Sequence, residues 1–368
     1  MKKIGILGIG KLGLCFALQL EKAGYDVIGF DKKPLYVDSI NAKSFRSSES
    51  GVTDSLKEAK NLIATTSLSA VIQKDIDLLF LFVNTPKSSD GGYDHRLIEG
   101  ITDDLIKFGE REKTVHLVLG CTTMPGYCDQ LSAKMAPYNY QVSYNPEFIA
   151  QGSIMSDLAS PDMVLIGEAN QQAGDLIETV YRNICTNHPQ FNRMDRLSAE
   201  ICKLAVNCFL TTKIAFANMI GDLAIASGAN SEKILNALGS DNRIGPKFLR
   251  YGFGYGGPCL SRDNRALSLF AEHLNIHLHI SAAADISNNQ HLDFQFNQML
   301  KEFDENAVIY FNSVTYKPES ELLDASQQLA LAVMLAKAGR KVKIVECKAV
   351  LDQIHSRYPG LFILEERD

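Results

Sequence analysis

The stretch KKIGILGIGKLG at residues 2–13 decides the fold of the N-terminal part of this chain. A short apolar run is followed by Gly8, Gly10 and Gly13 in the spacing GxGxxG, at the start of a helical pattern that ends near Gly24. In such a turn the first glycine makes the tight bend, the second lets a pyrophosphate approach the backbone, and the third lets the helix pack closely. The stretch therefore predicts a dinucleotide-binding strand-turn-helix unit.

An acidic residue ends the next apolar run. Asp31 lies 18 residues beyond Gly13, where a carboxylate accepts hydrogen bonds from the adenosine ribose and disfavours a 2′-phosphate. We therefore expect NAD rather than NADP, the alternative being a glycine turn that binds no nucleotide. Thr85 and Thr123 follow two further apolar runs, at the sheet edge where open parallel sheets bind ligands. By themselves these threonines are equally compatible with turns or caps.

The apolar runs continue through the first 195 residues and alternate with helical patterns, which is typical of a doubly wound α/β sheet of Rossmann type. The expected strands are KKIGILG, YDVIGFD, DLLFLFVNT, VHLVLGCT, QVSYNPE and DMVLIG. One long helix is expected from about Leu197 to Ser227, followed by further helices to about residue 300. The runs NAVIYFN, KVKIVE and LFIL then predict a short C-terminal α/β unit.

Composition limits the function classes. The chain has 368 residues, enough for two or three domains, and a formal charge of -6, which offers no basic surface for nucleic acid or an anionic membrane. Its eight cysteines form no CxxC pair and no zinc spacing, so we expect neither disulfides nor a metal site. No uncharged stretch reaches the length of a membrane span. We expect a reduced, cytoplasmic protein.

The run GFGYGGPCLSRD at residues 252–263 carries the most distinctive chemistry. Its glycines are too dense for a regular helix or strand, so they predict a loop whose backbone comes close to a ligand, with a helix starting at Pro258. A thiol at Cys259 can hold a substrate covalently, and the N-terminus of the following helix favours the reactive thiolate. Asp263 lies four residues further on. The alternatives are an inert, buried cysteine and a flexible surface loop.

Two further polar groups are candidates for this chemistry. Lys203 and Asn207, in AEICKLAVNCFL, are four residues apart and share one face of the long helix. An ammonium and an amide on one face can stabilise an alkoxide or a thioester oxyanion, although a solvated helix face has the same pattern. Glu147, in NPEF, follows an expected strand and can act as a base that activates water.

Taken together, these motifs resemble the UDP-glucose/GDP-mannose dehydrogenase family over nearly the whole chain. The matching stretches are GIGKLGL, NTPKSSDGGYD, TTMPG, NPEFIAQGSIMSDLASPDMVLIG, AEICKLAVN, SDNRIGPKF, GFGYGGPCLSRDNRAL and TYKP. Several motifs in this order are far more specific than GxGxxG alone. Within the family, GFGYGGPC is more similar to the UDP-glucose 6-dehydrogenases than to the hexosamine branches.

The resemblance implies an NAD-binding domain at residues 1–195, a central helical dimerisation region with the cysteine loop at 196–295, and a truncated UDP-sugar-binding domain at 296–368. It implies a homodimer that oxidises the C6 of UDP-glucose twice. The aldehyde is captured by Cys259 as a thiohemiacetal, a second oxidation gives a thioester, and hydrolysis releases the uronate. Lys203 and Asn207 would stabilise the oxyanion, while Glu147, Thr123 and Asp263 would handle protons and water.

The resemblance also implies binding residues. The cofactor contacts would be Gly8, Gly10, Lys11, Leu12, Gly13, Asp31, Thr85, Thr123 and Arg262. The substrate contacts would be Glu147, Phe148, Lys203, Asn207, Tyr251, Phe253, Gly254, Tyr255, Gly256 and Lys317, with Arg243 reaching the substrate of the neighbouring subunit.

Three residues depart from the family pattern. Gln151 replaces a second glutamate, Arg262 replaces a lysine with a planar guanidinium that is not its equivalent, and Asp324 stands where an arginine near the cofactor phosphates is usual. The C-terminal unit is also shorter than a full nucleotide-binding half. Three alternatives therefore stay open: the same chemistry on a UDP-hexosamine or GDP-mannose, a degenerate nucleotide-binding regulatory homologue, and a simple two-electron hydroxyacid dehydrogenase that has no use for Cys259.

Overall fold

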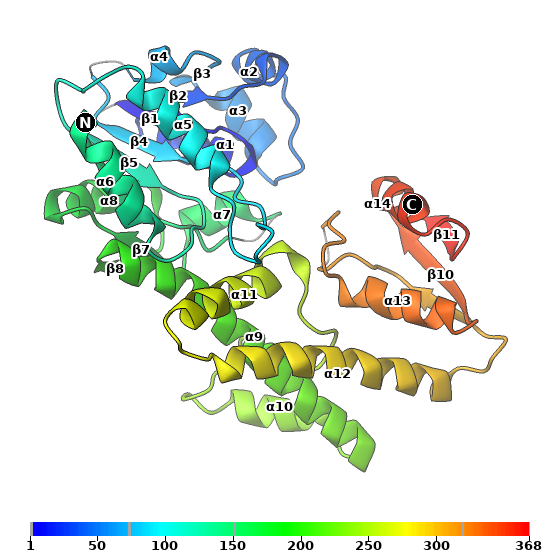
Figure 1. The fold of residues 1–368 in the computed structure, drawn as a ribbon. Helices are drawn as coiled ribbons and strands as arrows, with labels where there is room; N and C mark the ends of the chain where they lie inside the picture. The colour runs from blue at the N-terminus through cyan, green and yellow to red at the C-terminus, as the bar shows by residue number, and fades with distance from the viewer. Residues whose placement is uncertain (1–2, 73–74, 150–151, 318–319, 368) are drawn as a thin grey trace. The chain divides into compact units, whose positions relative to one another are not determined.

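The structure, a computed structural model, describes residues 3–72, 75–149, 152–317 and 320–367. These residues form two compact units, Met1–Lys203 and Leu204–Asp368 (Figure 1). The first unit is built on an eight-stranded sheet with the order β3-β2-β1-β4-β5-β6-β7-β8, and the second on a three-stranded sheet with helices.

The strands of the first unit are β1 (Lys3–Leu7), β2 (Asp26–Phe30), β3 (Leu62–Thr65), β4 (Leu78–Leu81), β5 (Val115–Leu119), β6 (Tyr140–Tyr144), β7 (Met163–Gly167) and β8 (Gln190–Met194). All neighbouring strands pair in parallel except β6 and β7, which meet in an antiparallel contact of Tyr144 with Gly167. The doubly wound fold expected from the sequence is confirmed.

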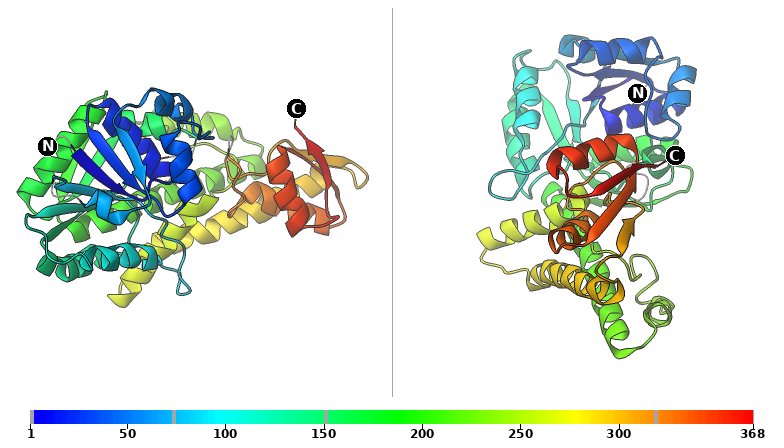
Figure 2. Two further views of the ribbon diagram at one scale, coloured as in Figure 1. Left: turned by 90° about the horizontal axis from the view of Figure 1, so that it is seen from above. Right: turned by 90° about the vertical axis from the view of Figure 1, so that its right-hand side faces the viewer.

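The helices of this unit lie on both faces of the sheet (Figure 2). They are α1 (Lys11–Lys22), α2 (Pro34–Asn41), α3 (Val52–Glu58), α4 (Leu68–Val71), α5 (Arg96–Ile106), α6 (Tyr127–Met135), α7 (Ile154–Ala159), α8 (Gln171–Ile184) and the 3-10 turn η1 (Ala136–Tyr138). Successive residues of β4 point to opposite faces of the sheet. Phe80 packs in a hydrophobic core with residues of α1 and α8, and Leu79 and Leu81 pack in a second core with residues of α5 and α6. Two-sided burial explains why these strands are almost continuously apolar.

The six strands expected in this unit are present, and two more strands occupy its edges. β3 is half-buried and β8, with the sequence QFNRM, has no fully buried residue. Neither strand shows the apolar run that marks a buried strand, because each has a neighbour on one side only.

The long helix α9 (Arg196–Ser227) begins in the first unit and continues in the second, as the apolar pattern predicts. Among the described residues it is the one helix that is long and apolar enough to cross a membrane by length and composition alone. Its most apolar window has a mean hydropathy of 1.3, although Lys213 falls within this region. Buried Glu200, Lys203 and Asn207 give α9 a polar row, so this helix carries buried polar side chains as well as an apolar face.

The second unit continues with α10 (Ser231–Gly239), α11 (Gly257–His273), α12 (His279–Glu302), β9 (Val308–Phe311), α13 (Gln327–Lys337), β10 (Lys341–Glu346), α14 (Lys348–Arg357) and β11 (Ile363–Glu366). The three strands pair in parallel in the order β11-β10-β9. Their core includes side chains of α13 and α14, and partly buried residues of α12 pack against it. The short C-terminal α/β unit expected from the sequence is therefore present.

Candidate active site

The glycine turn after β1 has the shape that a dinucleotide needs. Gly8 has a φ of 92°, and a Cβ there would lie 2.0 Å from the Phe82 carbonyl oxygen. A Cβ on Gly13 would lie 2.0 Å from the Gly8 carbonyl oxygen, so the helix packs on the turn itself. In contrast, a Cβ on Gly10 would meet no atom within 4 Å, which leaves room for a ligand at the start of α1. The residues present fit NAD.

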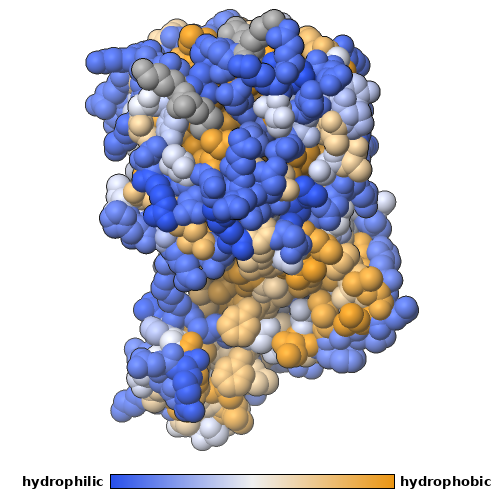
Figure 3. Space-filling model, turned by 90° about the vertical axis from the view of Figure 1, so that its left-hand side faces the viewer, coloured by the Kyte–Doolittle hydropathy of each residue, from blue (hydrophilic) through white to orange (hydrophobic). Residues whose placement is uncertain are grey.

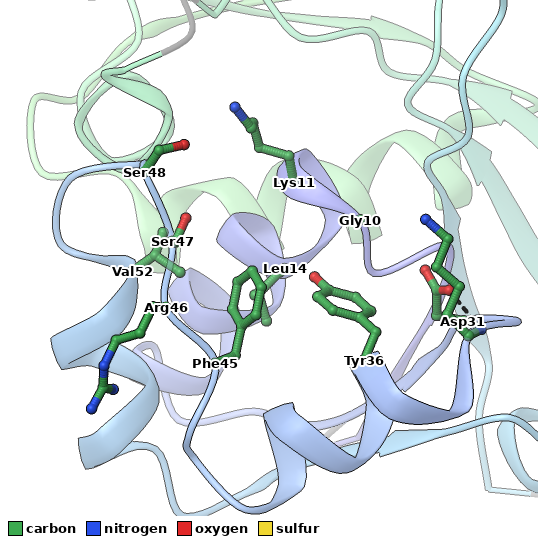
Figure 4. Close-up of a pocket in the computed structure, with 11 residues that line it drawn as sticks. Gly10, Lys11, Leu14, Asp31, Tyr36, Phe45, Arg46, Ser47, Ser48 and Val52 are labelled. Carbon is green, nitrogen blue, oxygen red and sulfur yellow. Dashed lines mark hydrogen bonds between the residues drawn. The ribbon is translucent and has the colours of Figure 1, made fainter. Parts of the chain in front are cut away.

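The turn opens into a cavity of about 340 Å³ (Figure 4). Gly10, Lys11 and Asp31 line it, and Figure 4 shows the Lys11 and Asp31 side chains on different sides of it. The Asp31 carboxylate also accepts a hydrogen bond of 3.1 Å from the Lys33 amide, which fixes it at the end of β2. Leu12, which follows Lys11 in α1, is half-buried and packs on the core. The arrangement suits a ribose diol near Asp31.

The opposite wall of this cavity was not predicted from the sequence. It consists of Phe45, Arg46, Ser47 and Ser48, from the segment between α2 and α3. Tyr36 also lines the cavity. Its hydroxyl donates to the Ile9 carbonyl at 2.7 Å, and its ring packs edge to face against Phe45. This irregular segment has no periodicity that would mark it as a binding wall.

Thr85 and Thr123 lie just past the ends of β4 and β5, which are neighbours in the sheet. Thr123 is completely buried, and its hydroxyl donates to Glu200 Oε1 at 2.7 Å. The same carboxylate accepts hydrogen bonds from the amides of Gly126, at 2.7 Å, and Cys128, at 2.9 Å. Burial raises the pKa of Glu200. This glutamate therefore holds the whole Thr123 turn, and it stands three residues before Lys203 on α9.

His95 supports the same turn from another side. Its Nε2 accepts a hydrogen bond of 3.2 Å from the Met124 amide, and its ring stacks on Tyr127 with centroids 3.8 Å apart. Burial lowers the pKa of His95 to about 4, so the ring is neutral at physiological pH and can act as this acceptor. Neither Glu200 nor His95 was predicted, because their role depends on contacts between distant parts of the chain.

Glu147 lies after β6 in a setting that favours proton transfer near neutral pH. Burial raises the pKa of Glu147 to about 7, and the hydrogen bond from the Tyr181 hydroxyl together with the charge of Lys203 offset part of that rise. The Lys203 ammonium lies 4.6 Å from the centroid of the Phe148 ring. The structure thus brings Glu147, Phe148 and Lys203 together. Tyr181 gives no sequence signal, since it belongs to the apolar face of α8.

In the second unit, Cys259 is exposed in the first turn of α11, which begins at Gly257. The loop before it is tightly packed rather than flexible. A Cβ on Gly254 would lie 2.3 Å from Asn288 Oδ1, and one on Gly256 would lie 2.3 Å from the Ala325 carbonyl oxygen. Gly257 has a φ of 81° and donates its amide to the Asp324 carbonyl at 2.8 Å. The density of glycine is explained by these close approaches.

A groove of about 380 Å³ runs along this loop. Its lining includes six of the residues expected to contact substrate, namely Tyr251, Phe253, Gly254, Tyr255, Gly256 and Lys317. The other lining residues are Ile214, Phe248, Arg250, Gly252, Leu260 and Tyr316. The groove thus has cationic side chains at Arg250 and Lys317 and aromatic rings among its lining residues. Such a mixture suits a nucleotide, whose phosphates are anionic and whose base is flat.

Asn207 and Asp263 meet inside the second unit. The Asn207 side-chain amide on α9 donates to Asp263 Oδ2 on α11 at 2.5 Å, and both residues are buried. Arg262, the preceding residue on α11, is half-buried. The candidate catalytic residues therefore fall into two groups: Thr123, Glu147 and Lys203 in the first unit, and Asn207, Cys259 and Asp263 in the second.

The other residues singled out from the sequence have different surroundings. Arg243 is exposed after α10 and pairs with Asp241 at 2.7 Å. Asp324 is exposed, and its main-chain carbonyl receives the Gly257 amide. Gln151 lies outside the described residues. Among the described residues no group of three or more His, Cys, Asp or Glu side chains could hold a metal ion.

A doubly wound sheet with this glycine turn and an acidic residue at the end of β2 defines a dinucleotide-binding protein. Residues 2–185 match the NAD-binding domain of the UDP-glucose/GDP-mannose dehydrogenase family, and residues 197–290 match the central domain of that family. The chain belongs to the UDP-glucose/GDP-mannose dehydrogenase family, a family of NAD-dependent nucleotide-sugar dehydrogenases.

Similar proteins carry names that differ in the sugar. A UDP-glucose 6-dehydrogenase of Rickettsia typhi is 30% identical over 77% of this chain and 66% of its own length. Two proteins of Pseudomonas aeruginosa, a UDP-glucose 6-dehydrogenase and a GDP-mannose 6-dehydrogenase, are each 28% identical, over 97% and 96% of this chain and 81% and 83% of their own lengths. The solved structure of a UDP-glucose dehydrogenase from Pyrobaculum islandicum superposes with a TM-score of 0.87 at 26% identity, covering 100% of this chain and 86% of that one.

Proposed function

We propose that this chain oxidises UDP-glucose twice at C6 with NAD and releases UDP-glucuronate. The observation that carries the proposal is the position of Cys259, exposed in the first turn of α11 at the end of a packed glycine loop that lines a groove with Lys317. A two-electron alcohol dehydrogenase needs no nucleophile, whereas two successive oxidations of one carbon need the aldehyde to be held. NAD, when bound, accepts the hydride.

We assign residues 1–195 to NAD binding, 196–295 to dimerisation and the cysteine loop, and 296–368 to the UDP part of the substrate. Gly8, Gly10, Lys11, Leu12, Gly13 and Asp31 would hold the adenosine and pyrophosphate side of NAD, with Thr85, Thr123 and Arg262 nearer the nicotinamide side. The packed loop and Lys317 would hold the nucleotide, because backbone amides and a lysine suit phosphate oxygens.

The chemical steps follow from the side chains. The Cys259 thiolate adds to the C6 aldehyde to give a thiohemiacetal, and oxidation of that adduct gives a thioester, which water cleaves to the carboxylate. Lys203 and Asn207 stabilise the oxyanion at each stage. Glu147 takes the proton from the attacking water, a role that suits a carboxyl group with a pKa of about 7. Thr123 would position the water, and Asp263 would hold the Asn207 side chain in place.

We propose that the active form is a homodimer. On α9, Phe209, Phe216 and Leu223 are exposed and seven residues apart, so they lie on one face of the helix, and exposed Met219 extends this face. Figure 3 shows apolar side chains gathered on the helices of the Leu204–Asp368 unit. A second copy of the chain would cover this surface and place Arg243 near its partner's substrate.

The experiment compares UDP-glucose with three alternatives: a UDP-hexosamine substrate, a GDP-mannose substrate, and nucleotide binding without turnover. Similar proteins are named for UDP-glucose and for GDP-mannose. The departures at Arg262 and Asp324 are the reason to test for a protein that binds nucleotide without turnover. Incubation with NAD and, separately, UDP-glucose, UDP-hexosamines and GDP-mannose, followed by mass spectrometry of the products, separates them. The proposal is supported if UDP-glucose is oxidised to UDP-glucuronate faster than the UDP-hexosamines and GDP-mannose are oxidised. Preferential oxidation of another nucleotide sugar would identify that sugar as the substrate, and NAD binding without any product would indicate a non-catalytic role.

We expect the site to work in the cytoplasm, where the thiol stays reduced.

A further inference from the structure

The turn that follows β9 carries two residues of the groove, Tyr316 and Lys317. The Lys317 ammonium lies 6.0 Å from the centroid of the Tyr316 ring. The Tyr316 ring packs on the glycine loop itself, since a Cβ on Gly257 would lie 2.5 Å from the Cδ2 atom of the ring. The position of this turn therefore sets part of the groove wall.

The start of the turn is held by Glu346, a buried residue that ends β10 and has no part in the chemistry described so far. Its Oε1 accepts a hydrogen bond of 2.7 Å from the Ser313 hydroxyl and one of 3.0 Å from the Val314 amide. Its Oε2 accepts from the Cys347 amide at 3.4 Å and lies 3.7 Å from the Arg367 guanidinium. Both carboxyl oxygens are thus occupied by the chain itself.

Buried hydroxyl groups hold further polar atoms of the turn. The Val314 carbonyl accepts from the Ser326 hydroxyl at 2.7 Å, and the Ser326 oxygen accepts the Leu329 amide at 3.1 Å, which caps α13. The Thr315 hydroxyl donates to the Lys317 carbonyl at 2.9 Å. Val314, Thr315 and Ser326 are all buried. Because a buried polar group that loses its partner is costly, this network favours one shape of the turn.

Glu346 occupies the same place in the second unit as Asp31 does in the first. β9, α13 and β10 repeat the arrangement of β1, α1 and β2, in which a helix joins two parallel neighbouring strands. Residues 8–10 join β1 to α1, and Asp31 lines the dinucleotide cavity. The connection from β9 to α13, residues 312–326, has no glycine, and Glu346 bonds that connection. The acid at the end of the second strand therefore supports a turn in this unit.

We propose that Glu346 is a positioning residue: by holding the Val314 amide, it keeps the turn at residues 313–317 where the groove receives a nucleotide. The last step rests on the proposed function, whereas the contacts of the turn do not. Without the Glu346 carboxyl oxygens the buried Val314 amide would lack an acceptor, and the turn would open to expose this amide to water. A nucleotide would then have to order the turn as it binds, which lowers its affinity.

Hydrogen exchange of the Val314 amide, followed by nuclear magnetic resonance of the full chain, tests the contact. The Val342 amide is the internal reference, because β10 has a strand on each side. In Glu346→Ala the ratio of the Val314 exchange rate to the Val342 exchange rate should rise about tenfold, the effect of losing one buried hydrogen bond. This ratio separates a local loosening of the turn from a loss of stability of the whole unit.

Two matched variants sharpen the measurement. Glu346→Gln keeps an oxygen that can accept from Val314, so the ratio should stay within about threefold of the wild type. Glu366→Gln, at an exposed position opposite Glu346 in the β10–β11 pairing, should leave the ratio unchanged. An unchanged ratio in Glu346→Ala would contradict the contact. A Val314 amide that exchanges freely in the wild type would also contradict it, and that result does not depend on any variant folding.

Calorimetry with UDP and GDP connects the turn to the groove without NAD or turnover. The nucleotide that binds the wild type should bind Glu346→Ala about tenfold more weakly, Glu346→Gln within about threefold, and Glu366→Gln equally well. NAD affinity, which belongs to the first unit, should be the same in all four proteins. In steady-state assays Glu346→Ala should raise the KM for the nucleotide sugar with little change in kcat.

The outcomes separate this role from the proposed function. Equal UDP or GDP affinity in the wild type and Glu346→Ala would overturn the positioning role and leave the proposed activity intact. Equal losses of NAD and nucleotide affinity in Glu346→Ala would also overturn it, because they would show a general effect on the fold. A wild type that binds neither UDP nor GDP would count against the proposed function, while the exchange measurement would still report the Glu346 contact.

Discussion

Replacing Glu147 by glutamine should stabilise the fold at high pH while removing the carboxyl group that we propose activates water. Burial raises the pKa of Glu147 from its ordinary 4.5 to about 7. The folded protein therefore binds this proton more tightly than the unfolded chain does. The stability contributed by this proton is fully present below about pH 4.5 and is lost as the pH rises through about 7.

The magnitude follows from the size of the shift. A difference of about 2.5 pKa units corresponds to about 3 kcal/mol of unfolding free energy between the two ends of this range. Glutamine has nearly the same shape as the protonated acid, and its side-chain oxygen can still accept from the Tyr181 hydroxyl. The Glu147→Gln variant should therefore match the wild type near pH 4.5 and exceed it by about 3 kcal/mol near pH 8.

Urea unfolding followed by circular dichroism between pH 4.5 and 8.5 measures this difference. Glu99→Gln on α5 is the matched control, since Glu99 is exposed and should leave the pH dependence unchanged. The same Glu147→Gln variant should accumulate enzyme-bound thioester and release little uronate. Parallel pH curves for the wild type and Glu147→Gln would refute the burial of this carboxyl group.

Three further predictions concern the cofactor turn, the Thr123 turn and the dimer. Gly10→Ala should unfold like the wild type but bind NAD more weakly in calorimetry, because the added Cβ meets no protein atom and projects into the space for the ligand. Gly13→Ala should instead destabilise the fold, because its added Cβ would meet the Gly8 carbonyl oxygen. Equal NAD affinity in Gly10→Ala and the wild type would contradict the assignment of this turn to NAD. Glu200→Gln, which replaces an acceptor of three hydrogen bonds, should lower the unfolding free energy by about 3 kcal/mol in urea titrations, and an unchanged midpoint would show that the turn is held otherwise. Phe216→Glu should convert a dimer to a monomer in light scattering after gel filtration, while a wild type that is already monomeric would remove the basis for a dimer.

The glycine turn and α9 could be predicted because their signals are local. GxGxxG encodes steric limits within a few residues of one another, and the apolar positions of α9 repeat along one continuous helix. The same holds for the packed loop before Cys259, where the density of glycine alone indicates close backbone approaches.

The polar supports of the site could not be predicted in the same way. Glu200 holds a turn more than 70 residues away in the chain, and Glu346 meets Val314 across more than 30 residues. Each looks in the sequence like an ordinary polar position on a helix or a strand, since its function depends on which distant acceptor or donor the fold brings near. β8 escapes prediction for a related reason: an edge strand can be polar and still pair with its neighbour.

The central claim is that Cys259 allows two oxidations of one sugar carbon, and the stoichiometry of NADH tests it most directly. Absorbance at 340 nm should show two NADH formed per UDP-glucose consumed by the wild type, with Cys259→Ser abolishing or stalling turnover while retaining NAD binding. One NADH per sugar, or two NADH per sugar in the serine variant, would contradict a mechanism that passes through a cysteine thioester.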